Sequence, residues 1–307
     1  MLVTAGLGTR LGALSDELPK PAMPVANRPA AWFALDHLAR FGVREVVLNT
    51  HHLADRLREE VERHAPPGLT LRFMHEPRIL GTGGGLRNAW RPEDGEHFVV
   101  MNGKLVFAPD LLAALERHVA ANAIATMVLR GMPPGGGFGA VEVDVEARVR
   151  RIRGLPVSAS TSGLAPRMFT GVHILSARAW RDLPEDGDVI EHAYARWLGR
   201  GETVLGVDDA GTWIDVGVSP RHYLEANLAL ARGQVVWPGI APGPRGVVFG
   251  AGAQVGEGAN VTDAVLGDGA VVAPGARVSR AVLWRGARVE SELTDAVVTS
   301  SGRVVRV

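Results

Sequence analysis

The sequence predicts an α/β domain with a mostly parallel sheet, followed by a short parallel β-helix. Three observations support this prediction: apolar runs alternate with helical stretches in the longer first part, glycine and proline then interrupt the pattern, and a repeat fills the remainder. We expect the first domain to span residues 1–232, a linker to span residues 233–246 and the repeat domain to span residues 247–307.

The first domain is predicted from strand-like and helix-like segments that follow one another in turn. Val43–Asn49 and His97–Met101 are short apolar runs, whereas Ala30–Phe41 and Pro109–Asn122 have helical character. Strands that alternate with helices are typical of a parallel sheet that is covered by helices.

The C-terminal part is predicted from a break and a regular spacing. Residues 237–244 read Trp-Pro-Gly-Ile-Ala-Pro-Gly-Pro, which cannot continue a helix. Beyond them, aliphatic residues recur every five or six positions, each with an alanine two positions earlier: Val255, Val261, Leu266, Val272, Val278, Leu283 and Val289. This period, with glycine at the turns, is typical of a parallel β-helix whose rungs bury these side chains.

Charge and composition limit the partners that we expect. The 33 basic and 33 acidic residues cancel, so no long-range field attracts nucleic acid or an anionic membrane. The absence of cysteine excludes disulfides, thiolate metal sites and a cysteine nucleophile. No signal-peptide pattern is found and no apolar run reaches the roughly 18 residues of a membrane span, which favours a cytoplasmic protein. The expected partners are small molecules and other copies of the chain, in a homo-oligomer.

A glycine-rich turn after the first apolar run indicates an anion site. Leu2–Leu11 contains Gly6 and Gly8 and then Arg10. Backbone N–H groups at such a turn approach an anion closely, and a guanidinium adds a fork of donors for phosphate oxygens. Lys20 lies between two prolines, which stiffen the backbone that carries it. Taken alone, both features have simpler explanations, because glycines can serve the turn itself and a lysine can lie in solvent.

Together with two later segments, this region resembles a known family. Gly6–Leu11 and Pro19–Pro21, followed by Glu76–Pro77 and Leu80–Gly84, closely resemble motifs of the sugar-phosphate nucleotidyltransferases. Among them the chain is most similar to the mannose-1-phosphate guanylyltransferase type, which carries a left-handed β-helix after a Rossmann-like catalytic domain. The resemblance implies that fold and the transfer of a nucleotidyl group from a nucleoside triphosphate to a sugar 1-phosphate, with release of pyrophosphate. GTP and mannose 1-phosphate are the expected pair, although similar loops in the family accept guanine, uracil or thymine, so the sequence alone does not name the base or the sugar.

The resemblance also implies roles for individual residues. The nucleotide would be bound by the glycine loop and by the Glu-Pro and Gly-Thr-Gly segments, that is, by Ala5, Gly6, Gly8, Thr9, Arg10, Glu76, Gly81, Thr82 and Gly83. The sugar phosphate would be bound by Asn102, Gly103, Gly139, Thr170 and Gly171. Catalysis would fall to Arg10, Lys20 and Asp215, and Asp215 would also hold Mg²⁺, which neutralises charge as two phosphates are brought together.

One position departs from the family pattern at the metal site. Where the family has its first metal-binding aspartate, after Asn102-Gly103, this chain has Lys104. An ammonium about 4 Å from Mg²⁺ would cost roughly 8 kcal/mol at an effective dielectric near 20. Lys104 therefore points elsewhere, or its charge replaces the metal, or the metal step is lost. The last case favours an alternative function, a catalytically impaired nucleotide-sugar-binding or regulatory subunit.

The sugar side departs from the family pattern as well. Arg151–Pro156 stands where the family has a Glu-Lys-Pro stretch, and Arg151 and Arg153 can contact a phosphate or lie at a solvated strand edge. His173, on an apolar strand, is expected to be a core residue rather than a sugar contact. An acyltransferase activity of the β-helix is not expected, because the last histidine, His222, precedes the repeats.

Overall fold

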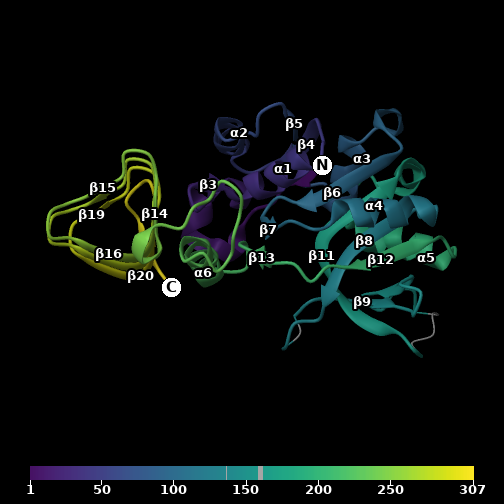
Figure 1. Ribbon diagram of the computed structural model, residues 1–307. Coiled ribbons are helices and arrows are strands. Elements are labelled where there is room, and N and C mark those ends of the chain that lie inside the picture. Colours follow the sequence, from purple (N-terminus) through teal and green to yellow (C-terminus); the bar gives the residue numbers. More distant parts are fainter. Residues whose placement is uncertain (136, 158–161) are drawn as a thin grey trace.

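The computed structural model describes residues 1–135, 137–157 and 162–307. Figure 1 shows an α/β domain and, beside it, a stack of strands formed by the C-terminal segment. The strands of the α/β domain are β1 (Leu2–Val3), β2 (Pro24–Val25), β3 (Arg28–Pro29), β4 (Glu45–Thr50), β5 (Thr70–His75), β6 (His97–Asn102), β7 (Leu105–Phe107), β8 (Ala125–Gly131), β9 (Ala140–Val143), β10 (Val149–Ile152), β11 (Ala165–Ser176), β12 (Val204–Asp208) and β13 (Trp213–Asp215). Its α-helices are α1 (Ala30–Arg40), α2 (Ala54–Arg63), α3 (Gly81–Ala89), α4 (Leu111–Ala120), α5 (Ala195–Gly199) and α6 (Pro220–Ala231). Shorter 3-10 segments are η1 (Thr9–Asp16), η2 (Lys20–Ala22), η3 (Pro92–Asp94), η4 (Ala177–Asp182) and η6 (Pro244–Gly246), and η5 (Ile190–Tyr194) is a π-helical turn.

The central sheet is parallel on its N-terminal side. β5, β4, β1 and β6 are neighbours in that order and run parallel, with Leu2 paired to both Leu48 and Met101. Antiparallel pairing enters through β11, which runs against β6, β8 and β9, whereas β12 lies parallel to β8. Because parallel strands end at the same edge of a sheet, the loops after β1, β4 and β6 meet there.

Helices cover the sheet because each buries an apolar face against it. On α1, Ala31, Leu35 and Leu38 recur at helical spacing and pack into one core cluster with residues of β1, β4 and β6. Side-chain caps fix where two helices begin: Asp110 accepts from the third residue of α4, and Ser219 does the same for α6, whose first residue is a proline.

A small second sheet lies next to the edge where these loops meet. β7 and β13 pair in antiparallel register, with Leu105 opposite Asp215. The backbone N–H of Val216 donates to the carbonyl oxygen of Lys104 (3.2 Å), which extends the pairing by one step. This register brings two residues that are far apart in sequence, Lys104 and Asp215, to the same place.

The C-terminal strand stack (residues 247–307) is built from parallel strands in register. One row contains β14 (Val247–Phe249), β16 (Asn260–Leu266), β18 (Arg277–Leu283) and β20 (Glu292–Val298), and a second row contains β15 (Gln254–Val255), β17 (Val271–Val272) and β19 (Arg288–Val289). β21 (Val304–Arg306) closes the first row in antiparallel direction. The aliphatic residues that the repeat predicts as inward are buried except Val255, which is 39% exposed because β15 begins its row.

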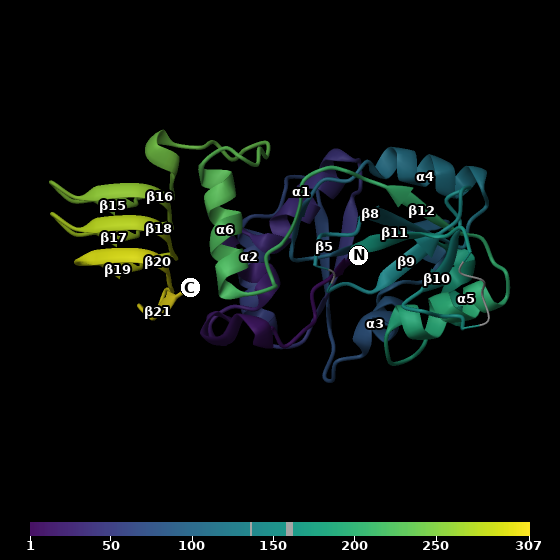
Figure 2. The ribbon, with the colours of Figure 1, turned by 90° about the horizontal axis from the view of Figure 1, so that it is seen from below.

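The strand stack packs against α6, which lies between it and the rest of the α/β domain (Figure 2). Trp284 of the stack is buried in a cluster with α6, and its ring nitrogen donates to Tyr223 Oη (3.0 Å). Ion pairs join the same surfaces, between Arg232 and Asp263 and between Arg280 and Glu225. Within the part of the chain that the structure describes, no helix is long and apolar enough to span a membrane.

Candidate functional site

The loop after β1 starts from a buried hydrogen-bond network. The amide oxygen of Asn49 accepts from the backbone N–H groups of Thr4 (2.8 Å) and Ala5 (3.3 Å). The amide nitrogen of Asn49 donates to Glu76 Oε1 (2.8 Å), and Glu76 Oε2 accepts from the backbone N–H of Leu80 (3.1 Å). Asn49 and Glu76 are 2% and 1% exposed, so the network fixes the loops after β1 and β5 to strand β4, which carries Asn49. Glu76, expected among the nucleotide contacts, thus has both carboxylate oxygens engaged in the protein.

The glycine loop remains open beside this network. Gly6, Thr9 and Arg10 are exposed, and a Cβ at Gly6 would meet no atom within 4 Å. Gly8 has φ = 72°, in the left-handed region that favours glycine, and a Cβ there would lie 3.6 Å from Lys20 Cε. The structure therefore brings the glycine loop and Lys20 together, as an anion site requires.

Lys20 lies in a cluster of positive charges. Its Nζ donates to the carbonyl oxygen of Gly217 (3.0 Å). Burial lowers the pKa of Lys20, the charges of Lys104 and Arg10 lower it further, and Asp215 acts in the opposite direction. An anion that binds among these three cations would relieve their mutual repulsion.

Lys104 is paired with the carboxylate that the sequence predicts as a metal ligand. Its Nζ donates to Asp215 Oδ2 (2.6 Å), and Asp215 Oδ1 accepts from the backbone N–H of Gly217 (2.8 Å). The two side chains of the ion pair are 26% and 11% exposed. Lys104 therefore points into the site and not away from it. Gly217, which is not among the site residues predicted from the sequence, allows this approach, because a Cβ there would lie 3.0 Å from Lys104 Cδ.

The residues present do not form a metal site. Both carboxylate oxygens of Asp215 already accept hydrogen bonds, and one of their donors is an ammonium. Among the described residues, no group of three or more histidine, aspartate or glutamate side chains could hold a metal ion. A divalent cation at Asp215 would have to displace Lys104 or bind against its charge.

A cavity of about 330 Å³ opens next to the ion pair. The charged residues in its described lining are Arg10, Lys104, Arg153 and Asp215, so positive charges exceed negative charges by two. Arg10 extends from the glycine loop and Arg153 follows β10. Lys104 directly precedes β7, and Asp215 is the last residue of β13. The cavity therefore has the charge that a phosphorylated ligand needs.

The residues expected on the sugar side line this same cavity, with one exception. Asn102, Gly139, Thr170 and Gly171 are in its lining, whereas Gly103 lies behind it, where a Cβ would meet Thr4 Cγ2. Gly171 has φ = 86° and a Cβ there would lie 2.3 Å from Asn102 Nδ2, so only glycine lets Asn102 occupy its position. The hydroxyl of Thr170 is buried and donates to the carbonyl oxygen of Val128 (2.7 Å).

The structure distinguishes Arg151 from Arg153, either of which could contact a phosphate according to the sequence. Arg151 is paired with Glu142 (3.2 Å) on the neighbouring strand β9. Arg153 lines the cavity and is 49% exposed, and among the residues that the structure describes its ion-pair partners are distant, Asp188 and Glu191, at 3.7 and 3.8 Å. Arg153 is thus the one of these two arginines that is placed to meet a phosphate.

His173 is a core residue, as the sequence indicated. It is 4% exposed, its Nδ1 shares a hydrogen bond with Tyr194 Oη (2.7 Å), and burial lowers its pKa to about 3. His173 is also not in the described lining of the cavity beside Lys104 and Asp215, so it belongs to the core and not to the candidate site.

The Gly-Thr-Gly segment at the start of α3 packs against residues 184–188. A Cβ at Gly81 would lie 2.5 Å from the carbonyl oxygen of Gly187, and a Cβ at Gly83 would lie 2.5 Å from Pro184 Cγ. Thr82 Oγ1 donates to Asp188 Oδ2 (3.2 Å). These protein contacts account for the glycines, and nucleotide contact by this segment stays a prediction.

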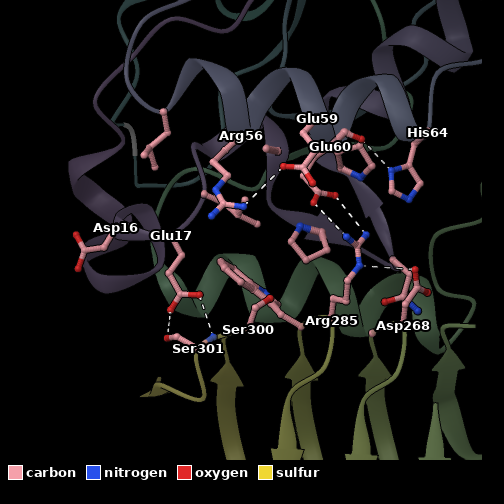
Figure 3. A pocket seen from close by; sticks show the side chains of 18 residues that line it. Asp16, Glu17, Arg56, Glu59, Glu60, His64, Asp268, Arg285, Ser300 and Ser301 are labelled. Atoms are coloured by element: carbon pink, nitrogen blue, oxygen red, sulfur yellow. Dashed lines mark hydrogen bonds and ion pairs between the residues drawn. The ribbon is translucent and has the colours of Figure 1, made fainter. Parts of the chain in front are cut away.

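A larger cavity, of about 610 Å³, lies between η1, α2 and the strand stack. Figure 3 shows that its charged side chains face one another: Arg285 reaches from the stack to Glu60 (3.4 Å), and Arg56 pairs with Glu59 (3.7 Å). None of the site residues predicted from the sequence lines it. Among the charged residues of its lining, the five carboxylates outnumber the two arginines, and both arginines pair with carboxylates, so the cavity is unsuited to a polyphosphate.

Comparisons with known proteins agree with this geometry. A family model described as nucleotidyl transferase matches residues 1–233. The chain is 27% identical over 286 residues to a mannose-1-phosphate guanylyltransferase of Mycobacterium tuberculosis, covering 86% of this chain and 78% of that protein. It is 28% identical over 232 residues to an N-acetylmuramate alpha-1-phosphate uridylyltransferase of Neisseria meningitidis, covering 72% and 94%. Among solved structures, HddC from Yersinia pseudotuberculosis in complex with GMP-PN has the same fold, with a TM-score of 0.60 at 22% identity over 74% of this chain and 96% of that one.

Proposed function

Because the chain belongs to the nucleotidyl transferase family of enzymes, we propose that it joins GTP to mannose 1-phosphate. An oxygen of the sugar phosphate attacks the α-phosphorus of the nucleotide, the bond from this phosphorus to the bridging oxygen breaks, and pyrophosphate leaves. The observation that carries the proposal is the cluster of Arg10, Lys20 and Lys104 around one carboxylate, Asp215. These charges match the phosphates that the reaction brings together, so that catalysis rests on positioning and neutralisation.

The two substrates take different sides of the cluster. The triphosphate lies on the glycine loop between Gly6 and Arg10, with Lys20 as a second cation. The sugar phosphate enters the cavity between Asn102 and Gly139, where Arg153 meets its phosphate. Glu76 supports the site indirectly, because its carboxylate accepts a hydrogen bond from the backbone N–H of Leu80 and so positions that loop.

The choice of GTP and mannose 1-phosphate is supported by the name of the Mycobacterium tuberculosis relative. Relatives that transfer a uridylyl group are almost equally similar, at 25% and 28% identity, so the base is the less supported part of the proposal. A panel that combines each nucleoside triphosphate with several sugar 1-phosphates, read by pyrophosphate release, selects the substrate pair.

A second candidate function, a nucleotide-binding subunit without turnover, is favoured by one observation. The Lys104–Asp215 ion pair occupies the position at which the family resemblance implies a metal. GTP binding without pyrophosphate release for any sugar 1-phosphate would support this candidate over the enzyme.

The C-terminal strand stack is proposed to wind as a left-handed β-helix and to mediate association between copies of the chain. The stack packs against α6 with one of its sides. Two apolar residues of the stack, Phe249 and Val255, are 53% and 39% exposed. Light scattering on Phe249→Ser tests the association, since a drop in molar mass would place the contact at this end of the stack, and an unchanged mass would count against it.

The nucleotide site is tested by Arg10→Ala and Lys20→Ala. Each removes a charge-assisted contact to phosphate and should weaken GTP binding about tenfold or more in calorimetric titration. Arg56→Ala is the matched control, because Arg56 is 64% exposed on α2, outside the cluster. Unchanged GTP affinity in both site variants would contradict the assignment.

A further inference from the structure

Lysine is rare in this chain and is confined to the site. Lys20 and Lys104 are the only lysines among the 33 basic residues, and all the others are arginines. A Cβ at Gly217 would lie 3.0 Å from Lys104 Cδ and 3.1 Å from Lys20 Cδ, so both side chains pass the same glycine. An ammonium is a compact point charge with three donors, whereas a guanidinium is a planar fork. The chain thus carries compact charges at the one place where phosphates are expected to meet.

Asp215 orients the Lys104 ammonium, and the cavity still has a net positive charge. One N–H of the ammonium donates to Asp215 Oδ2 (2.6 Å), which leaves two donors for other acceptors. The Lys104 side chain is 26% exposed and lines the cavity. Since Arg10 and Arg153 lie in the same lining, a polyphosphate finds an excess of positive charge before any metal is added.

We infer that the Lys104 ammonium takes the place of a divalent metal, so that this chain binds the triphosphate of its nucleotide without a metal ion. The inference rests on the proposed nucleotide site but not on turnover, and it holds for the enzyme and for a binding subunit alike. Added Mg²⁺ then brings no gain in affinity, because a second cation beside Lys104 is repelled and both oxygens of Asp215 already accept hydrogen bonds.

Calorimetric titration of the full chain with inorganic tripolyphosphate, which has neither base nor sugar, tests the inference. The dissociation constants in EDTA and in MgCl₂ are expected to agree within about threefold. Lys104→Met keeps the length of the side chain but not its charge, and should weaken binding in EDTA at least about tenfold. Arg56→Met, on the exposed face of α2, is the matched control and should bind as the parent chain does.

Two further measurements test the inference without relying on weaker binding in a variant that lacks the Lys104 charge. In Lys104→Asp the pair of carboxylates replaces the ion pair, so tripolyphosphate binding should disappear in EDTA and return with Mg²⁺. In the parent chain, an amine-reactive reagent read by peptide mass spectrometry reports on Lys20 and Lys104, the only lysines. Tripolyphosphate in EDTA should protect Lys104, and this readout needs no variant to fold.

The outcomes separate the inference from the proposed function. Tripolyphosphate and GTP that bind only with Mg²⁺, with Lys104 equally reactive in the presence and absence of ligand, would overturn the inference and leave the nucleotidyltransferase intact. Metal-free binding of tripolyphosphate with no binding of GTP would support the inference and overturn the choice of nucleotide. Binding of neither ligand under any condition would overturn both.

Discussion

Replacing Asn49 by alanine should reveal how much the buried network beneath the glycine loop contributes. The substitution removes the acceptor of the Thr4 and Ala5 N–H groups and the donor to Glu76 Oε1. At least two buried polar groups, the N–H of Thr4 and the carboxylate oxygen of Glu76, then lose a partner. Each such group costs about 1–3 kcal/mol, so Asn49→Ala should lower the free energy of unfolding by about 2–6 kcal/mol.

Urea unfolding measures this change as a lower midpoint at an unchanged m-value. Asn88→Ala is the matched control, because Asn88 is exposed on α3 and should change the free energy of unfolding by less than about 0.5 kcal/mol. GTP affinity should fall in Asn49→Ala as well, since the glycine loop begins at Ala5. A stability of Asn49→Ala within the range of the Asn88 control would refute the assignment of a cooperative network.

Two further predictions concern the core and the strand stack. His173 is neutral in the folded chain, with a pKa of about 3 against 6.5 in the unfolded chain, so the unfolded state binds the extra proton and stability falls as the pH drops below 6.5. From pH 8 to pH 5 this histidine should lower the free energy of unfolding by about 2 kcal/mol. The parent chain should therefore lose about 2 kcal/mol more than His173→Phe does over the same pH range. Equal losses in the two proteins would contradict the prediction. Trp284→Phe removes the hydrogen bond to Tyr223 and part of a buried ring, and should destabilise by about 1–3 kcal/mol in urea unfolding, whereas a neutral effect would show that the stack and α6 do not depend on this contact.

The fold could be predicted where burial leaves a period in the sequence. The repeat from Val261 to Val289 is buried as expected because each rung stacks on the next, and Val255 departs because nothing stacks on its outer side. The pairing of β7 with β13 was not predictable, since strands of three residues have no period and the partners lie about a hundred residues apart. The antiparallel pairing of β11 was not predicted either, because the alternation of strands with helices does not determine the direction of each strand.

The site could be predicted only in part from its motifs. The glycine loop and Lys20 lie together, since the loop and the proline-flanked lysine carry their own local signals. Asn49 gives no such signal, because its role arises from partners on other strands, and the sequence could not distinguish Arg153 from Arg151 as a phosphate contact. The glycines at the start of α3 show the converse, since a motif that resembles a nucleotide loop also satisfies close packing against residues 184–188.

Lys104 illustrates why charge alone leaves a mechanism open until geometry is known. From the sequence, this lysine could point away, replace the metal or mark its loss. The register that pairs Leu105 with Asp215 removes the first alternative, because it fixes the ammonium on the carboxylate. If the ammonium replaces the metal, as inferred above, Asp215 orients a lysine that would otherwise be repelled by Lys20 and Arg10. A carboxylate and an ammonium together carry no net charge, as do two carboxylates and one divalent ion, so the phosphates meet the same balance of charge in either arrangement.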